Sequence, residues 1–469
     1  MRPMTGVWGV MALGAMTAAG ARGAGPADVR PMQDELWLIG GCVVDAGPFD
    51  PAEMRGIVPA PVTTILNNGS PANRVDLVFV GDGYQAGQMT AYGTHVNSAL
   101  TALFNQEPFK TYKPLFNAHR VTVVSTDSGV DNDPTQGINR NTALDMLFWC
   151  GGTERLLCVN VSKAYDYALN APDVDQVFAV ANSTKYGGAG YPTNDLGTYS
   201  GGNGSSAEIA IHELGHSFGD LADEYDYGGP TTYTGAERPE PNATIRTATQ
   251  IANLQTKWWR WLNEDFPTFD GLVSAFEGCY YSELGVYRPS TNSKMRNLGR
   301  PFNPISVEAI ISNIYLEVDP IDNATAPGTY PSSTTLFVDP VDPVDAPLSV
   351  QWRVFGAPLP GATGTSFTPS SLPPGFQGIV EISVVVVDNT PWVRDPAIRA
   401  SRMTSSRSWL VVFPTPGDVN GDGFVNFTDI NAVLGVWLQM GTGLAADLNG
   451  DGVVNFEDLN IVLSNFNAG

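Results

Sequence analysis

The sequence feature that most constrains this chain is a pair of histidines, because the chain contains only four His. His212 and His216 lie four residues apart in a segment whose apolar residues recur at helical spacing. Ser205 and Glu208 form a capping-box pattern ahead of the pair, so we expect a helix to begin there. The two imidazoles would then lie one turn apart on one face, about 6 Å along the axis, where they can bind one Zn²⁺.

Glu213 follows the first of these histidines, at the position of the general base in His-Glu-x-x-His metalloproteases. The five-residue pattern also arises by chance on surface helices, so its context matters. Here it uses two of the four histidines of the chain and lies in a predicted helix. We therefore interpret the segment as the active-site helix of a zinc-dependent hydrolase.

The third zinc ligand is expected to be a carboxylate, because no histidine follows His216 and the other two, His95 and His119, lie far upstream. In an unbroken helix Asp223 would lie about 10.5 Å beyond His216 along the axis, too far to share a metal ion. The helix must therefore end and the chain fold back, and Gly219 suits this end because glycine accepts the left-handed conformation. Asp223 is then the preferred ligand. Its rivals are Asp220 and Glu224.

The most specific motif is the run His-Glu-Leu-Gly-His-Ser-Phe-Gly-Asp-Leu-Ala-Asp-Glu-Tyr over residues 212–225. Three further stretches look like the same family: residues 80–84, 182–188 and 287–302. Together they resemble the IgA-peptidase family of zinc endopeptidases, over roughly residues 74–316 and extending through residues 388–394. The resemblance implies an α/β, metzincin-like zinc peptidase domain, which we expect over residues 63–325.

The resemblance also implies a reaction. Zinc polarises the scissile carbonyl, and Glu213 takes a proton from water and passes it to the leaving amine. In metzincin-like folds a methionine-bearing turn lies beneath the metal, and Met295 is the candidate here, although methionine also commonly fills apolar gaps. Tyr287 is a candidate donor to the developing oxyanion. The stretch Tyr186-Gly187-Gly188 is a candidate strand edge for holding an extended peptide by main-chain pairing.

The N-terminus predicts export. Residues 1–24 have the pattern of a secretory signal peptide, with Arg2 ahead of a short apolar run and small residues at 19–21. No later stretch reaches the ~18 apolar residues of a membrane span. We therefore expect a secreted, extracellular or periplasmic protein without a transmembrane segment.

Four cysteines in an exported chain favour disulfides. Cys150 and Cys158 flank a Gly-Gly turn and form the preferred pair. Cys42 and Cys279 are then expected to pair or to stay free. Cys42 precedes the catalytic region, so it could instead block a metal in a latent form.

The chain is expected to contain further parts around the peptidase. Residues 25–62 form an N-terminal segment of uncertain structure. Within the α/β region we predict strands over residues 75–80, 121–124 and 176–181 and a helix over residues 88–104. A stretch rich in Pro, Thr and Ser at residues 319–333 predicts a linker. Alternating apolar residues and frequent turns over residues 326–414, with a long strand at 379–387, predict a small all-β immunoglobulin-like sandwich.

The C-terminal residues 415–469 contain a repeated calcium-loop pattern. They hold seven carboxylates and no Lys or Arg, and each ligand type recurs 29 residues later. The predicted ligands are Asp418, Asn420, Asp422, Phe424, Asn426 and Asp429 in the first loop, and Asp447, Asn449, Asp451, Val453, Asn455 and Asp458 in the second. An apolar helical face follows each loop. The segment resembles a type I dockerin, which implies a small all-α domain that binds Ca²⁺ and a cohesin-like partner.

A formal net charge of −23 excludes nucleic acid as the default partner, because phosphate binding needs clustered Lys and Arg. We expect a secreted zinc metalloendopeptidase that hydrolyses extracellular proteins or glycoproteins and attaches to a partner, at the cell surface for instance, through its dockerin. One alternative is a catalytically inactive binding or scaffold protein of an extracellular assembly, against which the intact His212, Glu213 and His216 argue. Another is a structural envelope or matrix protein in which only the sandwich and the tail act.

Overall fold

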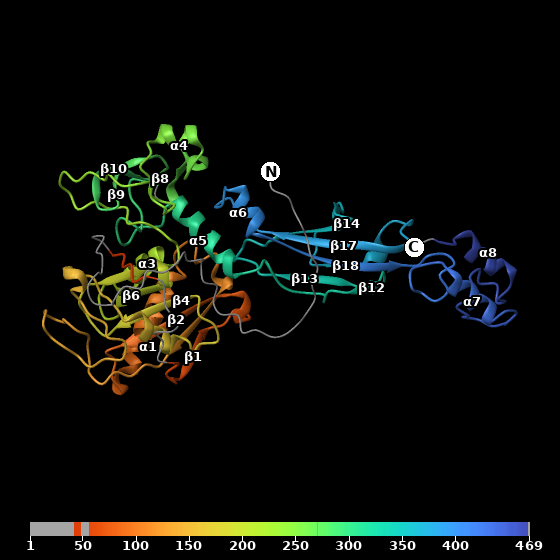
Figure 1. Ribbon diagram of the computed structural model, residues 1–469, viewed down its shortest axis with the longest axis horizontal. Helices are drawn as coiled ribbons and strands as arrows, with labels where there is room; N and C mark the ends of the chain where they lie inside the picture. The colour runs from red at the N-terminus through yellow and green to blue at the C-terminus, as the bar shows by residue number, and fades with distance from the viewer. Residues whose placement is uncertain (1–41, 48–55, 270, 468–469) are drawn as a thin grey trace.

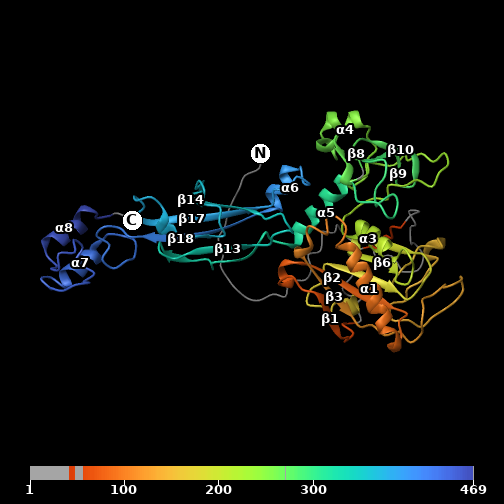
Figure 2. The same ribbon diagram turned by 180° about the vertical axis from the view of Figure 1, so that it is seen from behind.

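The computed structural model describes residues 42–47, 56–269 and 271–467 (Figure 1). The predicted signal peptide, residues 1–24, and most of the N-terminal segment lie outside the described residues. The described chain forms an elongated molecule with an α/β region at one end, a β-rich part in the middle and two short helices at the other end, as both views show (Figures 1 and 2).

A six-stranded sheet forms the centre of the α/β region. Its strands, in spatial order, are β1 (Val62–Leu66), β3 (Phe116–Val121), β2 (Val75–Asp82), β4 (Gln176–Ala181), β6 (Leu196–Ser200) and β5 (Gly188–Tyr191). The four central strands are parallel, and β1 and β5 run antiparallel at the two edges. Strands β2, β4 and β6 are buried along their whole length, as expected of strands covered on both faces.

Strand β3 corrects one prediction, because it lies before the stretch 121–124 that the sequence favours. Polar residues obscure it. His119 and Asn117 are buried in this strand, and both contact the Asp76 carboxylate of β2, His119 through Nε2 at 2.6 Å. The prediction over 176–181 coincides with β4, and that over 88–104 is one residue longer at each end than helix α1 (Met89–Leu103).

Helices cover both faces of the sheet. α1, α3 (Ser206–Ser217) and α5 (Pro304–Glu317) contribute to one apolar core, and α2 (Val161–Ala168) contributes to the core on the opposite face. The chain between α3 and α5 forms a smaller lobe. It contains α4 (Ala248–Leu254), β7 (Asp265–Phe266), β8 (Gly271–Leu272), β9 (Phe276–Cys279) and β10 (Ser282–Arg288).

The middle part consists of two sheets that share one apolar core. One sheet has the order β11 (Ile321–Ala324), β13 (Leu336–Pro340), β16 (Ser366–Phe367). The other has the order β12 (Thr329–Pro331), β18 (Thr404–Phe413), β17 (Gly378–Val387), β14 (Ser349–Val354), β15 (Ala357–Pro358). Trp352 and Trp409 stack between them with ring centroids 5.7 Å apart.

The linker predicted over residues 319–333 is wrong, because this stretch contributes β11 and β12 to the two sheets. Its proline content is compatible with a strand because Pro331 lies in β12, at the edge of its sheet, where proline is tolerated. The sheet region therefore begins at Ile321, a few residues before the boundary expected at 325/326.

Polar contacts fix the sheets against the α/β region. The Asp388 carboxylate accepts hydrogen bonds from the hydroxyls of Tyr112 and Tyr315, at 2.6 and 2.9 Å. Arg74 forms an ion pair with Asp322 at 2.8 Å. The short helix α6 (Pro396–Ser401) joins β17 to β18 on the same side.

The C-terminal part contains α7 (Phe427–Gly435) and α8 (Phe456–Ser464). Each helix begins with an asparagine, Asn426 or Asn455, in a complete capping box with an aspartate three residues later. Val433 and Val462 are buried between the two helices. Among the helices of the described residues, none has the length and apolar character needed to cross a membrane.

Candidate active site

Helix α3 carries His212, Glu213 and His216 as the sequence predicts, but it does not begin with a capping box. The Ser205 side chain makes no capping hydrogen bond. Glu208 instead accepts hydrogen bonds from the ammonium of Lys294 and from the backbone N–H of Gly299. These contacts tie the start of α3 to the loop that follows β10.

The chain reverses immediately after α3, as required if a later carboxylate is to reach the histidines. The helix ends at Ser217, and Asp220 adopts the left-handed conformation with φ of 53°, in place of the predicted Gly219. Gly219 is needed for a different reason: a Cβ there would lie 2.7 Å from the carbonyl oxygen of Gly215. This close approach brings the chain back along the helix toward Asp223.

The chain reversal brings one donor atom each from His212, His216 and Asp223 together. The Nε2 atoms of His212 and His216 lie 3.2 Å apart, and Asp223 Oδ1 lies 3.1 and 3.2 Å from them. A tetrahedral zinc ion with bonds of about 2.0–2.1 Å places neighbouring ligand atoms about 3.3 Å apart. The three residues therefore fit one zinc ion both in donor chemistry and in spacing.

The atoms of the three residues that face away from this triangle of donor atoms also make hydrogen bonds. The Nδ1 of His212 faces the carbonyl of Lys294 at 3.0 Å, and that of His216 faces the carbonyl of Leu221 at 2.7 Å. Because a carbonyl only accepts, each Nδ1 carries a proton, and Nε2 is the atom that can bind a metal once the ring is neutral. The Tyr281 hydroxyl donates to Asp223 Oδ2 at 2.6 Å and so orients the carboxylate.

The charges of this group favour a cation between the donor atoms. Burial alone would lower the pKa of His216, but the Asp223 carboxylate raises it to about 10. Burial alone would raise the pKa of Asp223, but the two histidines hold it well below its usual range. The carboxylate is thus negatively charged, and a divalent cation would supply the positive charge that it attracts.

Glu213 lies close to the two histidines, and one of its carboxylate oxygens and the ligand nitrogens of His212 and His216 all lie within 4.8 Å of one another. Its side chain is buried, and its Oε2 has no hydrogen-bond partner among the described residues. Burial raises the pKa of Glu213 well above its ordinary value. The Glu213 side chain fits here only because residue 188 is a glycine: a Cβ on Gly188 of β5 would lie 2.7 Å from Glu213 Oε1. An unpartnered buried carboxylate of this kind is suited to hold a proton for another molecule.

A cavity of about 260 Å³ opens over the two catalytic-motif residues His212 and Glu213. Its wall also includes Gly188, Tyr186 and Tyr225. Strand β5 is the last strand of the sheet beside this cavity. Of the stretch Tyr186-Gly187-Gly188 that is expected from the sequence to offer an exposed strand edge, only Gly188 lies in β5, and the strand is buried.

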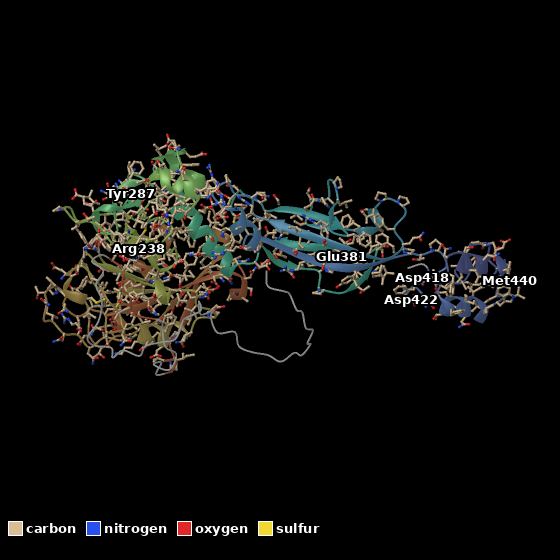
Figure 3. The ribbon with its side chains drawn as sticks, turned by 45° about the horizontal axis from the view of Figure 1, so that its top comes forward. Arg238, Tyr287, Glu381, Asp418, Asp422 and Met440 are labelled. Carbon is tan, nitrogen blue, oxygen red and sulfur yellow. A yellow bond between two sulfur atoms is a disulfide. The ribbon has the colours of Figure 1, made fainter. Side chains whose placement is uncertain are left out.

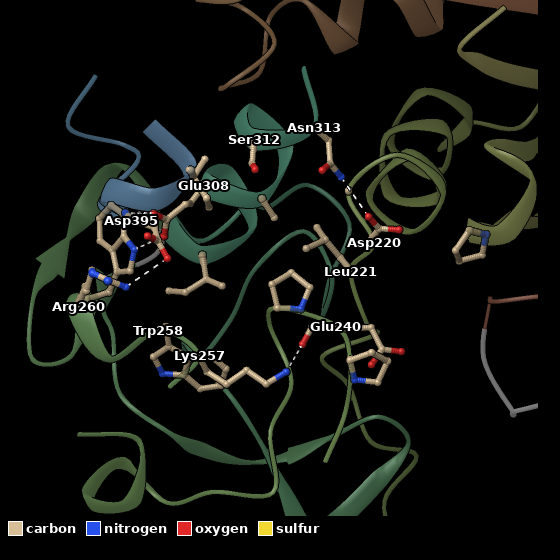
Figure 4. Close-up of a pocket in the computed structure, with 18 of the residues that line it drawn as sticks. Asp220, Leu221, Glu240, Lys257, Trp258, Arg260, Glu308, Ser312, Asn313 and Asp395 are labelled. Atoms are coloured by element: carbon tan, nitrogen blue, oxygen red, sulfur yellow. Dashed lines mark hydrogen bonds and ion pairs between the residues drawn. The ribbon is translucent and has the colours of Figure 1, made fainter. Parts of the chain in front are cut away.

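Asp220 and Glu224, the two alternative candidates for the third ligand, make contacts away from the histidine pair. Asp220 Oδ2 accepts a hydrogen bond from Asn313 at 3.1 Å, on the wall of a separate cavity of about 600 Å³ (Figure 4). Glu224 is buried and accepts hydrogen bonds from Asn242, Ser293 and Asn303. Of the three candidates, only Asp223 contacts the histidine pair.

Met295 lies beneath the helix. It is fully buried, and its sulfur packs so closely on α3 that a Cβ on Gly215 would lie 2.5 Å from it. Its neighbour Lys294 supplies the carbonyl that faces His212.

Tyr287 does not line the described cavity over the histidines. It lies on β10, in the α/β half of the molecule (Figure 3), opposite Glu277. Its hydroxyl interacts with the Glu277 carboxylate. Because Tyr287 and Glu277 are directly paired, their side chains lie on the same face of the two-stranded sheet. The expectation that Tyr287 serves the oxyanion therefore finds no support in the contacts of this residue.

The cysteines divide as the sequence favours. A disulfide joins Cys150 to Cys158, and Cys42 and Cys279 are both free and buried. Tyr281 and Arg155 are site residues that sequence reasoning missed. Neither belongs to the motif, although Arg155 lies inside the predicted disulfide loop.

The two C-terminal loops form at the opposite end of the molecule (Figure 3). In the first, the Asp418 carboxylate accepts hydrogen bonds from the backbone N–H groups of Asp422 and Gly423, and Gly423 has φ of 88°. In the second, Asp447 and Gly452 repeat this arrangement, with φ of 89° at the glycine. The turn and the all-oxygen donor set fit a Ca²⁺ loop.

The last acidic position closes each loop. Asp429 accepts from the backbone N–H groups of Val419 and Asn426, at 2.9 Å each. Asp458 makes the equivalent contacts with Leu448 and Asn455, at 2.7 and 2.8 Å. The repeat seen in the sequence is thus a repeat of the hydrogen-bond network.

Comparisons with protein families find two matches along the chain. The family model described as IgA Peptidase M64 matches residues 63–271, and the model described as Dockerin type I domain matches residues 416–467. A comparison with curated proteins finds no match for the chain. Residues 63–271 are therefore similar to the IgA Peptidase M64 family, and residues 416–467 are similar to the type I dockerin domain.

Proposed function

We propose that this protein is a zinc endopeptidase that hydrolyses extracellular proteins or glycoproteins and is held to a partner by its dockerin. The observation that carries the proposal is the triangle of donor atoms from His212, His216 and Asp223, with sides of 3.1 to 3.2 Å. The proposed zinc ligands are these three residues. A zinc ion held there would polarise the scissile carbonyl and activate a water molecule.

The chain's own residues supply the remaining steps. Glu213 is proposed to take a proton from the attacking water and to deliver it to the leaving amine, because its Oε2 is buried and unpartnered beside the donor atoms. Tyr281 keeps Asp223 oriented through its 2.6 Å hydrogen bond. Met295 packs against α3 at Gly215.

Strand β5 is proposed to bind the substrate main chain. Gly190 directs its N–H and C=O groups away from β6, as its outward hydrogen bonds show. An extended peptide could pair with the same groups, which would lay its backbone beside Glu213.

This function is tested with a protein substrate such as denatured casein. We expect internal cleavage, detected by mass spectrometry of the fragments, that stops on chelation and returns on addition of Zn²⁺. Fragments trimmed only from their ends would contradict an endopeptidase.

The dockerin is proposed to bind two Ca²⁺ ions and, when folded around them, a cohesin-type partner on an extracellular assembly. Phe427 and Phe456 occupy equivalent positions in the two halves and are 70% and 61% exposed. Leu434 and Leu463, likewise equivalent, are also exposed. This repeated apolar surface supports docking of a protein partner.

Calcium binding is tested by titrating the full chain with Ca²⁺ in a calorimeter. We expect two ions per chain, one in Asp418→Ala or Asp447→Ala, and none in the double variant, because each aspartate organises one loop. The two single variants are matched controls for each other. Equal binding by the wild-type chain and the double variant would assign calcium to other residues.

A further inference from the structure

The N-terminal segment Cys42–Val44 lies on the outer edge of β5, beside the proposed metal site. The Val44 N–H donates to the Gly190 carbonyl, and the Gly190 N–H donates to the Cys42 carbonyl, both at 2.8 Å. Val43 thereby pairs with Gly190 in parallel orientation. The segment therefore uses the main-chain groups that we assign to substrate binding.

The side chain of Cys42 is directed to the proposed metal ligands. Its sulfur and the ligand atoms of His212 and Asp223 all lie within 4.8 Å of one another, and all three residues are buried. Cys42 also lines the cavity of about 260 Å³ over Glu213. A cysteine sulfur is a preferred zinc ligand, so this position completes a four-donor set of two histidines, one aspartate and one cysteine.

Several neighbours hold the sulfur in place. Arg155 Nη1 donates to Cys42 Sγ at 3.0 Å, and the Tyr225 hydroxyl lies 3.5 Å from it. The Cys42 N–H donates to Asp223 Oδ2 at 3.4 Å. Arg155 lies in the loop closed by the Cys150–Cys158 disulfide, which restrains this contact.

The other free cysteine provides a contrast. Cys279 is also buried, but its sulfur contacts the backbone carbonyl of Asp223 at 3.4 Å. It therefore faces the main chain behind the site, whereas Cys42 faces the donor atoms.

We propose that Cys42 is a fourth protein ligand of the metal and that residues 42–44 keep the peptidase in a latent form. The proposal rests on the zinc site proposed above. A zinc site with four protein ligands is closed, whereas a catalytic site keeps one position open. Removal or displacement of the segment would open that position and free the main-chain groups of Gly190 together.

Cobalt substitution tests the fourth ligand directly. The full chain is stripped of metal and loaded with Co²⁺, whose visible bands report binding at the site and whose near-ultraviolet charge-transfer band reports a thiolate ligand. We expect both signals in the wild-type chain and in Cys279→Ala, and only the visible bands in Cys42→Ala. Cys42→Ala should also hydrolyse casein faster than the wild-type chain, because it leaves the fourth position at the metal open.

A second measurement uses the wild-type chain alone. Iodoacetamide should alkylate Cys42 in the metal-free chain at least about tenfold faster than in the zinc-loaded chain, as seen by peptide mapping, because a metal-bound thiolate is withheld from the reagent. Visible bands without a charge-transfer band, or equal alkylation with and without zinc, would overturn the role of Cys42. Failure to bind Co²⁺ at all would instead overturn the zinc site on which the proposal depends.

Discussion

Glu213→Gln is expected to abolish proteolysis while leaving zinc bound. The substitution preserves the size of the side chain but removes its ability to accept a proton. Since the carboxylate lies beside the donor triangle and is not one of its three members, metal affinity should persist. Loss of a general base lowers the turnover rate by about 10²- to 10⁴-fold. The measurement is the initial rate of casein cleavage together with the zinc content of the same sample.

The matched control is Glu283→Gln, the same change at an exposed position on β10. It should cleave at the wild-type rate. A Glu213→Gln variant that also cleaves at the wild-type rate would show that another group accepts the proton.

Asp223→Asn is expected to release the metal, whereas Asp220→Asn should retain it. Asp223 Oδ1 lies 3.1 and 3.2 Å from the two histidine nitrogens, and the residue is fully buried. Asp220 hydrogen-bonds to Asn313 in the other cavity. Changes to outer partners of a zinc site cost about 10- to 100-fold in affinity, so loss of a direct ligand should cost at least the upper value.

The pair is well matched because both variants replace aspartate with asparagine within one turn of the chain. Asparagine also tolerates the left-handed conformation of residue 220. Competition with a chelator of known zinc affinity measures both variants. Equal affinities, or weaker binding by Asp220→Asn, would exclude Asp223 as the third ligand.

Local patterns in the sequence predicted the central parts of this account. The helix with His212 and His216 follows from helical periodicity, and the need for a chain reversal follows from the helical rise alone. Both loops of the dockerin follow from a repeat in ligand spacing. These features depend on neighbours in the sequence, so they can be predicted without knowledge of distant contacts.

Other features depend on contacts between distant residues. Strand β3 lies earlier than the sequence predicts because its buried His119 and Asn117 are satisfied by Asp76, which is distant in the sequence. The sequence predicts a linker where β11 and β12 lie, because the stability of these strands comes from the sheets that they join.

The candidate site also depends on contacts between residues that are distant in the sequence. Tyr281 contacts Asp223 from 58 residues away, and Arg155 contacts Cys42 from 113 residues away. No short-range pattern carries these pairings. The sequence favours Tyr287 as the tyrosine of the site, whereas the turn before β10 brings Tyr281 to the Asp223 carboxylate.

The most direct test of the proposed zinc site is the metal content of the purified full chain. It is measured by inductively coupled plasma mass spectrometry after dialysis into a buffer that contains calcium. We expect one zinc ion per chain in the wild type and less than about one tenth of that in the His212→Ala, His216→Ala double variant, because both histidine ligands would be lost and only Asp223 and Cys42 would remain. Casein cleavage should fall in parallel with zinc. A wild-type chain that binds no zinc and gains no activity when zinc is added would contradict the central claim.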